Sequence, residues 1–354
     1  MPPRLDHPGS VDTLTHALSG ALLARATLGR APQTPAGERV RVAFLAAAFP
    51  DIDYLASWID PLIYLNSHQG LTHSLVLMPA WAALLTSLAA RWYGRRWRDF
   101  YGPALLGVLA HIAGDLITAY GTEVFAPLTF ERYAYPIAFV LDPYFTAITA
   151  GGLWLSVHRD SRLAAQIGLA TLLAYLGLLA GLRAEALDMG LGVANERGLG
   201  ARDVAALPQP FTPLNWKLLI SEGSTVHEAH LRLRRRFPPA LGTLWFPKTA
   251  AAFRDDVGLV AHPRFGTDPH WTPLAREVWR QPGFAGFRRF AGYPVLHRID
   301  TAGAQTCLWF TDLRFALPHL VPAFRFGMCR GSPESTWRLY RLRLWSANER
   351  QPLG

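Results

Sequence analysis

Apolar residues gather in six stretches within the first half of the chain, at about 14–28, 41–59, 71–90, 102–119, 136–157 and 163–182. A helix that spans a membrane needs roughly 20 apolar residues. The last stretch meets this length without a charged side chain. The first is short and fits a tilted or re-entrant helix, and Pro50 interrupts the second, because proline kinks a helix. The pattern predicts a membrane all-α helical bundle of about five to six apolar helices over residues 1–185.

The second half of the chain alternates apolar and polar positions over short runs. Examples are the runs at 227–233, 306–310 and 337–342. Such alternation is typical of strands with one buried face. We therefore expect residues 186–354 to form an extramembrane domain that is mostly β or α+β, joined to the helices by a linker that begins near residue 184.

Composition supports a membrane protein. Half of the 354 residues are hydrophobic, 17% are charged and the mean hydropathy is +0.12, whereas about a quarter of a typical soluble domain is charged. The formal net charge of +9 comes mainly from arginines in alternate loops. This distribution fits cytoplasmic loops better than a nucleic-acid surface, so no nucleic-acid partner is expected. If all six stretches span, both termini and the C-terminal domain lie outside the cytosol.

The chain has two cysteines, Cys307 and Cys329. Their spacing matches no zinc-binding motif, so they cannot build a cysteine-type metal site. Whether they pair is left open, because a structural disulfide requires a domain outside the reducing cytosol.

His111 and Asp115 are two ionisable residues within the apolar stretch 102–119. They lie four residues apart, so on a helix both side chains share one face. In an apolar environment an imidazole or a carboxylate must be paired, hydrogen-bonded or bound to a metal. The pair predicts either a two-ligand clamp for a divalent cation or a buried ion pair between helices.

Six further His and Asp residues fall at similar depth in this topology, near the outer leaflet: His16, Asp51, Asp53, His68, His73 and Asp142. Taken singly, each also fits a helix cap, an acid that complements a helix dipole or a solvated loop residue. For Asp142 the sequence favours neither of two roles, a helix cap or a metal ligand. Together the eight residues favour a metal site, because imidazole and carboxylate suit Zn²⁺, Mn²⁺ or Fe²⁺.

Eight candidates exceed the needs of one tetrahedral ion. We therefore expect one or two divalent ions, with zinc favoured over manganese and iron. Either two ions share a bridging carboxylate, or one ion is held while the other acids orient the histidines. A metal with an open position lowers the pKa of bound water to roughly 7, which is hydrolase chemistry. The sequence has no GxSxG, Walker or HExxH motif, so serine hydrolases, P-loop NTPases and zincins lack support.

Four motifs resemble the YdjM family of bacterial inner-membrane proteins, which are classed as metal-dependent hydrolases: THALSG (15–20), PDIDYL (50–55), HQGLTHS (68–74) and HIAGDLITAYGT (111–122). The resemblance covers about residues 11–185, and PQPFTPLNW (208–216) and LWFTDLRF (308–315) are similar to the longer members. It implies a multi-pass protein of the bacterial inner membrane. One departure is Gln69, where many relatives are expected to have an arginine.

The resemblance implies that seven of these residues are metal or catalytic positions. We assign the metal to His16, Asp53, His68, His111 and Asp115, with Asp51 or His73 as general base or hydrogen-bond partner. The pattern is more distantly similar to zinc-dependent phospholipase C and the single-strand-specific zinc nucleases. This suggests a phosphoester or lipid-linked substrate, with membrane lipid as the partner.

Two other functions fit the same residues. Intramembrane His and Asp also mark metal-ion or proton transporters, although transport favours ligands spread across the bilayer and these lie at one depth. The chain could also be a structural membrane protein with a non-catalytic polar cluster.

Overall fold

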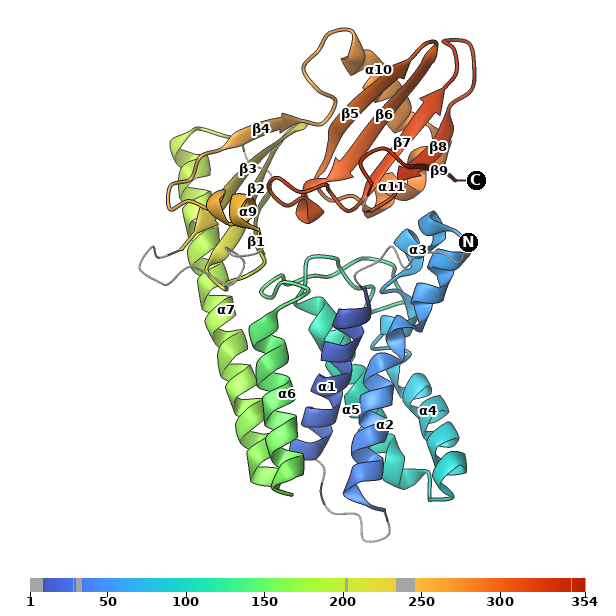
Figure 1. Cartoon of the computed structure of the whole chain (residues 1–354), viewed down its shortest axis with the longest axis vertical. Helices are drawn as coiled ribbons and strands as arrows, with labels where there is room; N and C mark the ends of the chain where they lie inside the picture. Colours follow the sequence, from blue (N-terminus) through green and yellow to red (C-terminus); the bar gives the residue numbers. More distant parts are fainter. Residues whose placement is uncertain are drawn as a thin grey trace. The chain divides into compact units, whose positions relative to one another are not determined.

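The computed structural model describes residues 9–27, 29, 34–200, 203–233, 246–344 and 346–353, with side chains from residue 12 onward. The chain divides into two compact units (Figure 1). The helical unit comprises residues 8–58 and 67–181, and the sheet unit comprises residues 59–66 and 182–354.

The helical unit is built from α-helices and two short 3-10 helices. These elements are α1 (Gly9–Thr27), α2 (Ala36–Ala48), η1 (Pro50–Trp58), η2 (Leu71–His73), α4 (Met78–Tyr93), α5 (Arg98–Leu116), α6 (Pro143–His158) and the first part of α7 (Arg162–Glu196). The short helix α3 (Pro61–Ser67) lies almost wholly in the sheet unit. Pro50 ends α2 and begins η1, as expected of a residue that cannot donate a helical hydrogen bond.

Three helices of this unit, α1, α2 and α5, cross closely over two glycines. A Cβ added at Gly20 would lie 2.5 Å from the Cβ of Ala47, and one added at Gly107 would lie 2.4 Å from the carbonyl oxygen of Ala43. Residues without side chains let helix backbones approach each other. His16 and His111 each lie one helical turn from this crossing, so the crossing fixes the positions of both imidazoles.

The expectation of five to six apolar spanning helices is wrong. Among the described residues one helix, Arg162–Glu196, is long and apolar enough to cross a membrane, and a second span arises only if the pair Pro61–His73 and Met78–Tyr93, bent by 79°, counts as one. The apolar stretches overestimate the number of spans because several break into shorter pieces. Helices α2, α4 and α6 have 13, 16 and 16 residues, fewer than the roughly 20 needed.

The described residues of the sheet unit form two antiparallel sheets. The first has four strands, β1 (Asp203–Pro208), β2 (Asn215–Glu222), β3 (Thr225–Arg232) and β4 (Val260–Pro263). The second has five, β5 (Pro294–Ala302), β6 (Gln305–Asp312), β7 (Arg325–Arg330), β8 (Arg338–Leu342) and β9 (Arg350–Pro352). Short helices accompany them: α9 (Pro247–Ala251), α10 (Trp271–Arg280), η3 (Pro282–Phe284), α11 (Ala285–Phe290) and η4 (Leu313–Phe315).

The two faces of the first sheet differ in polarity. Trp216 and Leu218 pack against Leu182 and Ala186 at the end of α7. The neighbouring residue, Lys217, points to the opposite face, because side chains alternate along a strand. Its buried ammonium lies 2.9 Å from the carboxylate of Glu228 and donates a hydrogen bond to the carbonyl oxygen of Leu313. A buried charge is thereby paired.

Glu228 is the acidic centre of this polar face. His262 and His230 approach its carboxylate at 3.1 and 3.5 Å. Burial alone would raise the pKa of Glu228, but His262, Lys217 and His230 lower it to about 2. The carboxylate therefore stays ionised over the physiological pH range.

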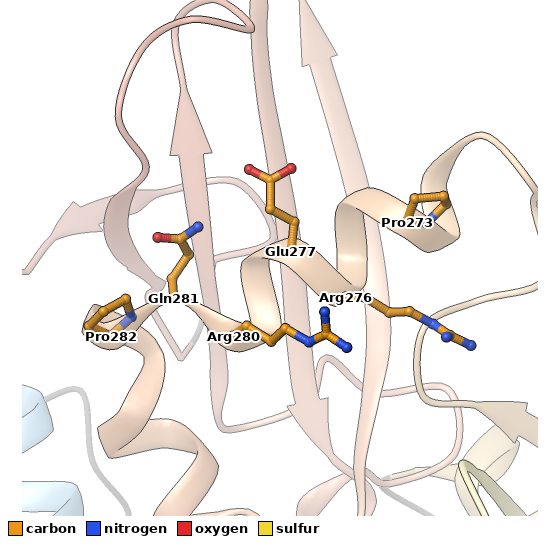
Figure 2. A pocket seen from close by; sticks show the side chains of 6 residues that line it. All are labelled: Pro273, Arg276, Glu277, Arg280, Gln281 and Pro282. Atoms are coloured by element: carbon orange, nitrogen blue, oxygen red, sulfur yellow. The ribbon is translucent and has the colours of Figure 1, made fainter.

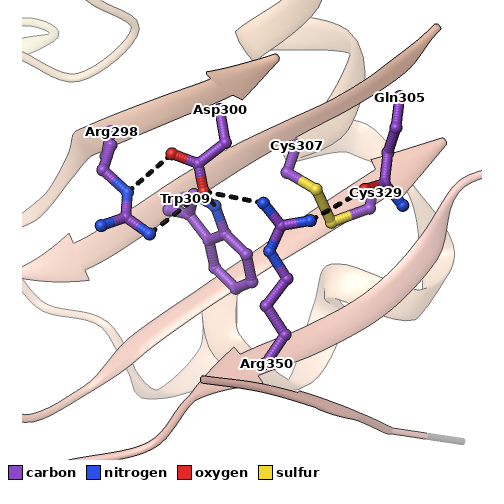
Figure 3. The surroundings of a disulfide bond; sticks show 7 residues. All are labelled: Arg298, Asp300, Gln305, Cys307, Trp309, Cys329 and Arg350. Atoms are coloured by element: carbon purple, nitrogen blue, oxygen red, sulfur yellow. Dashed lines mark hydrogen bonds and ion pairs between the residues drawn. A yellow bond between two sulfur atoms is a disulfide. The ribbon is translucent and has the colours of Figure 1, made fainter. Parts of the chain in front are cut away.

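A disulfide joins the middle strands of the second sheet. Cys307 and Cys329 form the bond between β6 and β7, where they are direct cross-strand partners. Figure 3 shows Asp300 beside it, where its carboxylate accepts hydrogen bonds from Trp309 and Arg350 and pairs with Arg298. The disulfide therefore links β6 to β7 covalently, and the ion pairs and hydrogen bonds of Asp300 add polar contacts in the same sheet.

Candidate metal centre

The seven residues assigned above as metal or catalytic positions come together in the helical unit. Helix α1 supplies His16, η1 supplies Asp51 and Asp53, the loop before η2 supplies His68, η2 supplies His73, and α5 supplies His111 and Asp115. Their ligand atoms form three overlapping groups that could each hold a metal ion: His16, His111 and Asp115; Asp51, His73 and His111; Asp51, Asp53 and His68. Four helical elements and a loop thus converge on one cluster.

Two imidazole nitrogens and two carboxylate oxygens meet at the centre of the cluster, at distances close to those between the ligands of a tetrahedral metal ion. Nε2 of His73 lies 3.0 Å from Nε2 of His111 and 3.0 Å from Oδ2 of Asp115. Nε2 of His111 lies 3.3 Å from the same oxygen. Oδ1 of Asp51 lies 3.5 Å from His111 and 3.9 Å from His73. Zinc bonds of about 2.0–2.1 Å put tetrahedral ligands roughly 3.3 Å apart. We call these residues the four-donor group.

Hydrogen bonds at the other ring nitrogens set both imidazoles in the form that binds metal. Nδ1 of His111 lies 2.6 Å from the carbonyl oxygen of Ala47, to which it can only donate. Nδ1 of His73 lies 2.9 Å from the Thr72 hydroxyl and 3.4 Å from Oδ2 of Asp53. With Nδ1 protonated in each ring, the Nε2 lone pairs point at one another. Such contacts at the far nitrogen are typical of metal-ligating histidines.

Asp115 connects the four-donor group to His16. Its Oδ1 lies 3.2 Å from Nε2 of His16, while its Oδ2 faces His73 and His111. Both Nε2 of His16 and Oδ2 of Asp115 are buried without a hydrogen-bond partner. Buried polar atoms are rarely left so, and a cation would satisfy both. These residues therefore fit a divalent metal.

Asp12 is a member of the cluster that the sequence analysis missed. Its Oδ1 lies 3.3 Å from Nε2 of His16. We call Asp12, His16 and Oδ1 of Asp115 the three-donor group. The signal was present in the sequence, because Asp12 and His16 have the same four-residue spacing that singled out His111 and Asp115. It was overlooked because Asp12 precedes the apolar stretch.

Glycine at position 114 makes room for the His16 ring. A Cβ at Gly114 would lie 2.6 Å from Nδ1 and from Cε1 of His16. No real Cβ approaches another atom so closely, so His16 depends on the absence of a side chain here.

Asp53 and His68 form a pair beside the four-donor group. Oδ1 of Asp53 lies 2.8 Å from Nδ1 of His68, and its Oδ2 accepts hydrogen bonds from the Gln69 backbone and the Thr72 hydroxyl. Both carboxylate oxygens are thus engaged within the protein. Burial would raise the pKa of Asp53, but His68, His73 and the Gln69 amide hold it below its ordinary value.

Asp142 lies outside these groups. Its side chain accepts hydrogen bonds from the backbone amides of Tyr144 and Phe145 and caps α6, and its second oxygen accepts from the Tyr175 hydroxyl. Of the two interpretations left open for this residue, the cap is the one found.

A surface depression in the sheet unit contains none of these residues. Figure 2 shows its lining, which is Pro273, Arg276, Glu277, Arg280, Gln281 and Pro282. The Glu277 carboxylate there is engaged by Trp337 and Arg330, so the depression offers no comparable set of metal donors.

Comparisons with known proteins agree with the position of the cluster. Residues 11–185 match the model of a family described as YdjM inner membrane protein. The uncharacterized protein YfhP of Bacillus subtilis (strain 168) is 30% identical over 143 residues, which is 38% of this chain and 42% of YfhP. The match thus covers less than half of that relative. No solved structure matches the chain. Every residue of the four-donor and three-donor groups lies within the matched segment, so the part of the chain that carries the cluster, residues 11–185, is the part that matches the YdjM inner membrane protein family.

Proposed function

We propose that the chain is a metal-dependent hydrolase with two adjacent metal positions that share Asp115. The observation that carries this proposal is the convergence of Nε2 of His73, Nε2 of His111 and Oδ2 of Asp115 at 3.0–3.3 Å, with Oδ1 of Asp51 at 3.5–3.9 Å from the two imidazoles. In this arrangement His73, His111, Asp51 and Oδ2 of Asp115 hold one ion. His16, Asp12 and Oδ1 of Asp115 hold a second and leave part of its coordination open. Zinc is favoured, because the donors are imidazole and carboxylate at tetrahedral spacing.

A divalent ion bound here would acidify a water molecule and polarise a phosphoryl or carbonyl oxygen. The pair of Asp53 and His68 would supply the proton acceptor. Asp53 holds the Nδ1 proton of His68, so Nε2 is the basic nitrogen of that ring. Asp53 also orients His73 through Nδ1. This proposal changes four of the roles expected from the sequence. It makes His73 and Asp51 metal ligands. It makes His68 the base and Asp53 the carboxylate that orients it.

The proposed substrate is a phosphoester or a lipid-linked molecule. Two cations close together stabilise the attacking and leaving oxygens of a phosphoryl group. The match to an inner membrane protein family and the apolar helix Arg162–Glu196 support access from the lipid phase. The metal and the substrate together define the proposed activity.

We further propose that the sheet unit lies outside the cytosol. The support is the bond between Cys307 and Cys329, because disulfides persist in oxidising compartments and are rare in the cytosol. Helix α7 would anchor the chain in the inner membrane, since it alone among the described helices passes unbroken as a candidate span.

Elemental analysis of the full chain in detergent tests the metal centre. The wild type is compared with the double variant His111→Ala/Asp115→Ala, and Asp142→Asn serves as a control that removes an acid outside the cluster. Stoichiometric metal in the wild type and the control, absent from the double variant, supports the site. Hydrolysis of bis(p-nitrophenyl) phosphate and of phospholipid vesicles is then measured before chelation, after chelation and after reloading. A wild-type protein that binds no divalent metal at neutral pH would overturn the proposal.

A further inference from the structure

One loop of the helical unit exposes aromatic and aliphatic side chains beside the metal centre. This loop, residues 121–135, lies in the segment that connects α5 to α6. Leu128 is 79% exposed and Phe130 is 52% exposed, and three neighbours also reach the surface: Phe125, Tyr133 and Tyr135. Single apolar residues on a surface are common, but five within one loop form a patch that usually marks a contact.

The loop is a fixed structure rather than a loose connection. Thr122 and Tyr133 exchange backbone hydrogen bonds of 2.9 and 3.0 Å and so close its base. Within its tip, the amides of Leu128 and Thr129 both donate to the carbonyl oxygen of Phe125. The Phe125 and Tyr133 rings lie edge to face with centroids 5.4 Å apart. The exposed side chains are therefore presented by an ordered backbone.

The base of the loop is bonded to the residues around His68. The Thr122 hydroxyl donates to Oε1 of Gln69, and the Glu123 amide donates to the Gln69 carbonyl oxygen. Arg132 donates to the carbonyl oxygen of His68. Whatever the loop tip contacts is consequently held close to the metal centre.

One ion pair within the loop balances two of its charges. Its three charged residues are Glu123, Glu131 and Arg132. Arg132 lies 3.3 Å from the carboxylate of Glu123, and Glu131 accepts a hydrogen bond from the Tyr133 hydroxyl. The pairing of Arg132 with Glu123 reduces the cost of bringing these two groups towards an apolar layer, while Glu131 stays exposed to water.

We propose that the tip of this loop inserts into the lipid surface of the membrane, with Leu128 and Phe130 at the boundary between head groups and acyl chains. Tyrosine and phenylalanine together with leucine are the side chains that favour this boundary. The same unit contains the beginning of α7, the candidate span, so a bilayer is available to it. The base of the loop is bonded to the His68 backbone, so, on the proposed hydrolase function, this placement would make the bilayer itself the source of substrate.

Spin labels test this placement without reference to hydrolysis. Leu128→Cys and Phe130→Cys are introduced separately into the full chain, whose two native cysteines are bonded to each other. Val260→Cys, at another exposed apolar residue (57% exposed) in the sheet unit, is the matched control. The labelled proteins are reconstituted in vesicles of phosphatidylethanolamine and phosphatidylglycerol. Collision rates with oxygen, which enters lipid, and with a water-soluble nickel chelate are then measured, and metal content verifies the fold.

The expected result is a shift towards oxygen and away from nickel at residues 128 and 130, with the opposite preference at residue 260. A label at residue 128 that is as open to nickel as the control overturns the proposal. So does a label shielded from both reagents, because this indicates contact with protein, such as a second copy of the chain. Metal binding and hydrolysis could each succeed or fail independently of this outcome.

Discussion

Nε2 of His73 faces Nε2 of His111 at 3.0 Å, and both rings are fully buried. Both Nδ1 atoms have acceptors for their protons, so two lone pairs point at each other. Lone pairs repel unless a cation lies between them. A metal supplies that cation without the cost of burying a protonated imidazole, and this relationship motivates the first prediction.

Replacing His73 and His68 should have different effects. His73→Ala removes a donor of the four-donor group, so the purified variant should lose at least one equivalent of metal. His68→Ala should keep its metal but hydrolyse phosphodiesters about 100-fold more slowly or worse, as expected for loss of a general base. Elemental analysis and steady-state kinetics measure both effects. The reverse pattern, in which only the His68 variant loses metal, would restore the roles expected from the sequence.

Gly114→Ala should empty the three-donor group selectively. The new Cβ would meet the His16 ring at 2.6 Å, so the ring must move away from Asp12 and Asp115. Metal content should fall from two equivalents towards one. Gly151→Ala in α6 is the matched control, because a Cβ there meets nothing within 4 Å. Equal metal content in the two variants would argue against His16 as a ligand.

Reduction of the Cys307–Cys329 bond should destabilise the sheet unit. The bond closes a loop with a sequence separation of 22 residues, for which the loop-entropy model predicts a loss of about 3 kcal/mol. Thermal unfolding of oxidised and reduced protein in detergent measures this difference. In intact cells the two thiols should resist maleimide until a reductant is added. Labelling without reductant would place the sheet unit in the cytosol.

Stability should depend on Glu228 at acidic pH. Because its pKa is lowered to about 2 in the folded chain, its contribution is present above its ordinary pKa of about 4.5 and is lost as the pH falls towards 2. Glu228→Gln should remove this dependence and cost about 3 kcal/mol at neutral pH, since the buried Lys217 then loses the carboxylate that pairs with it at 2.9 Å. Unfolding curves between pH 2 and pH 7 measure both effects.

Glu222→Gln is the control for this variant. Glu222 pairs with His227 at 2.9 Å, but its side chain is 41% exposed, and exposed pairs contribute little. A similar loss of stability in the two variants would show that burial of Lys217 is not the cause.

The sequence predicted which His and Asp residues come together, because spacing and polarity contrast are local signals. His111 and Asp115 share a helix face at four-residue spacing, and each candidate was conspicuous in an apolar background. The role of each residue within the cluster was harder to predict from the sequence. Whether Asp53 binds metal or supports His73 depends on which oxygen faces which ring, and such contacts between η1 and η2 cannot be read from spacing.

The membrane topology could not be predicted for a different reason. Hydropathy along the chain does not detect where a helix ends. The apolar stretch at 71–90 contains η2 and a turn before α4 begins at Met78, and the stretch at 136–157 begins in a loop, since α6 starts at Pro143. Helix length, which depends on prolines and on tertiary contacts, decides whether an apolar stretch can span.

The single carboxylate of Asp115 has a consequence for how the centre fills. An ion bound to one of its oxygens draws electron density from the other, and it also fixes the orientation of the shared group. In the proposed two-ion centre the two binding events would therefore be thermodynamically linked, and by reciprocity each ion would alter the affinity for the other by the same factor. A titration should show two unequal steps rather than one, and the occupancy of the second position would then follow the free metal concentration of the surroundings.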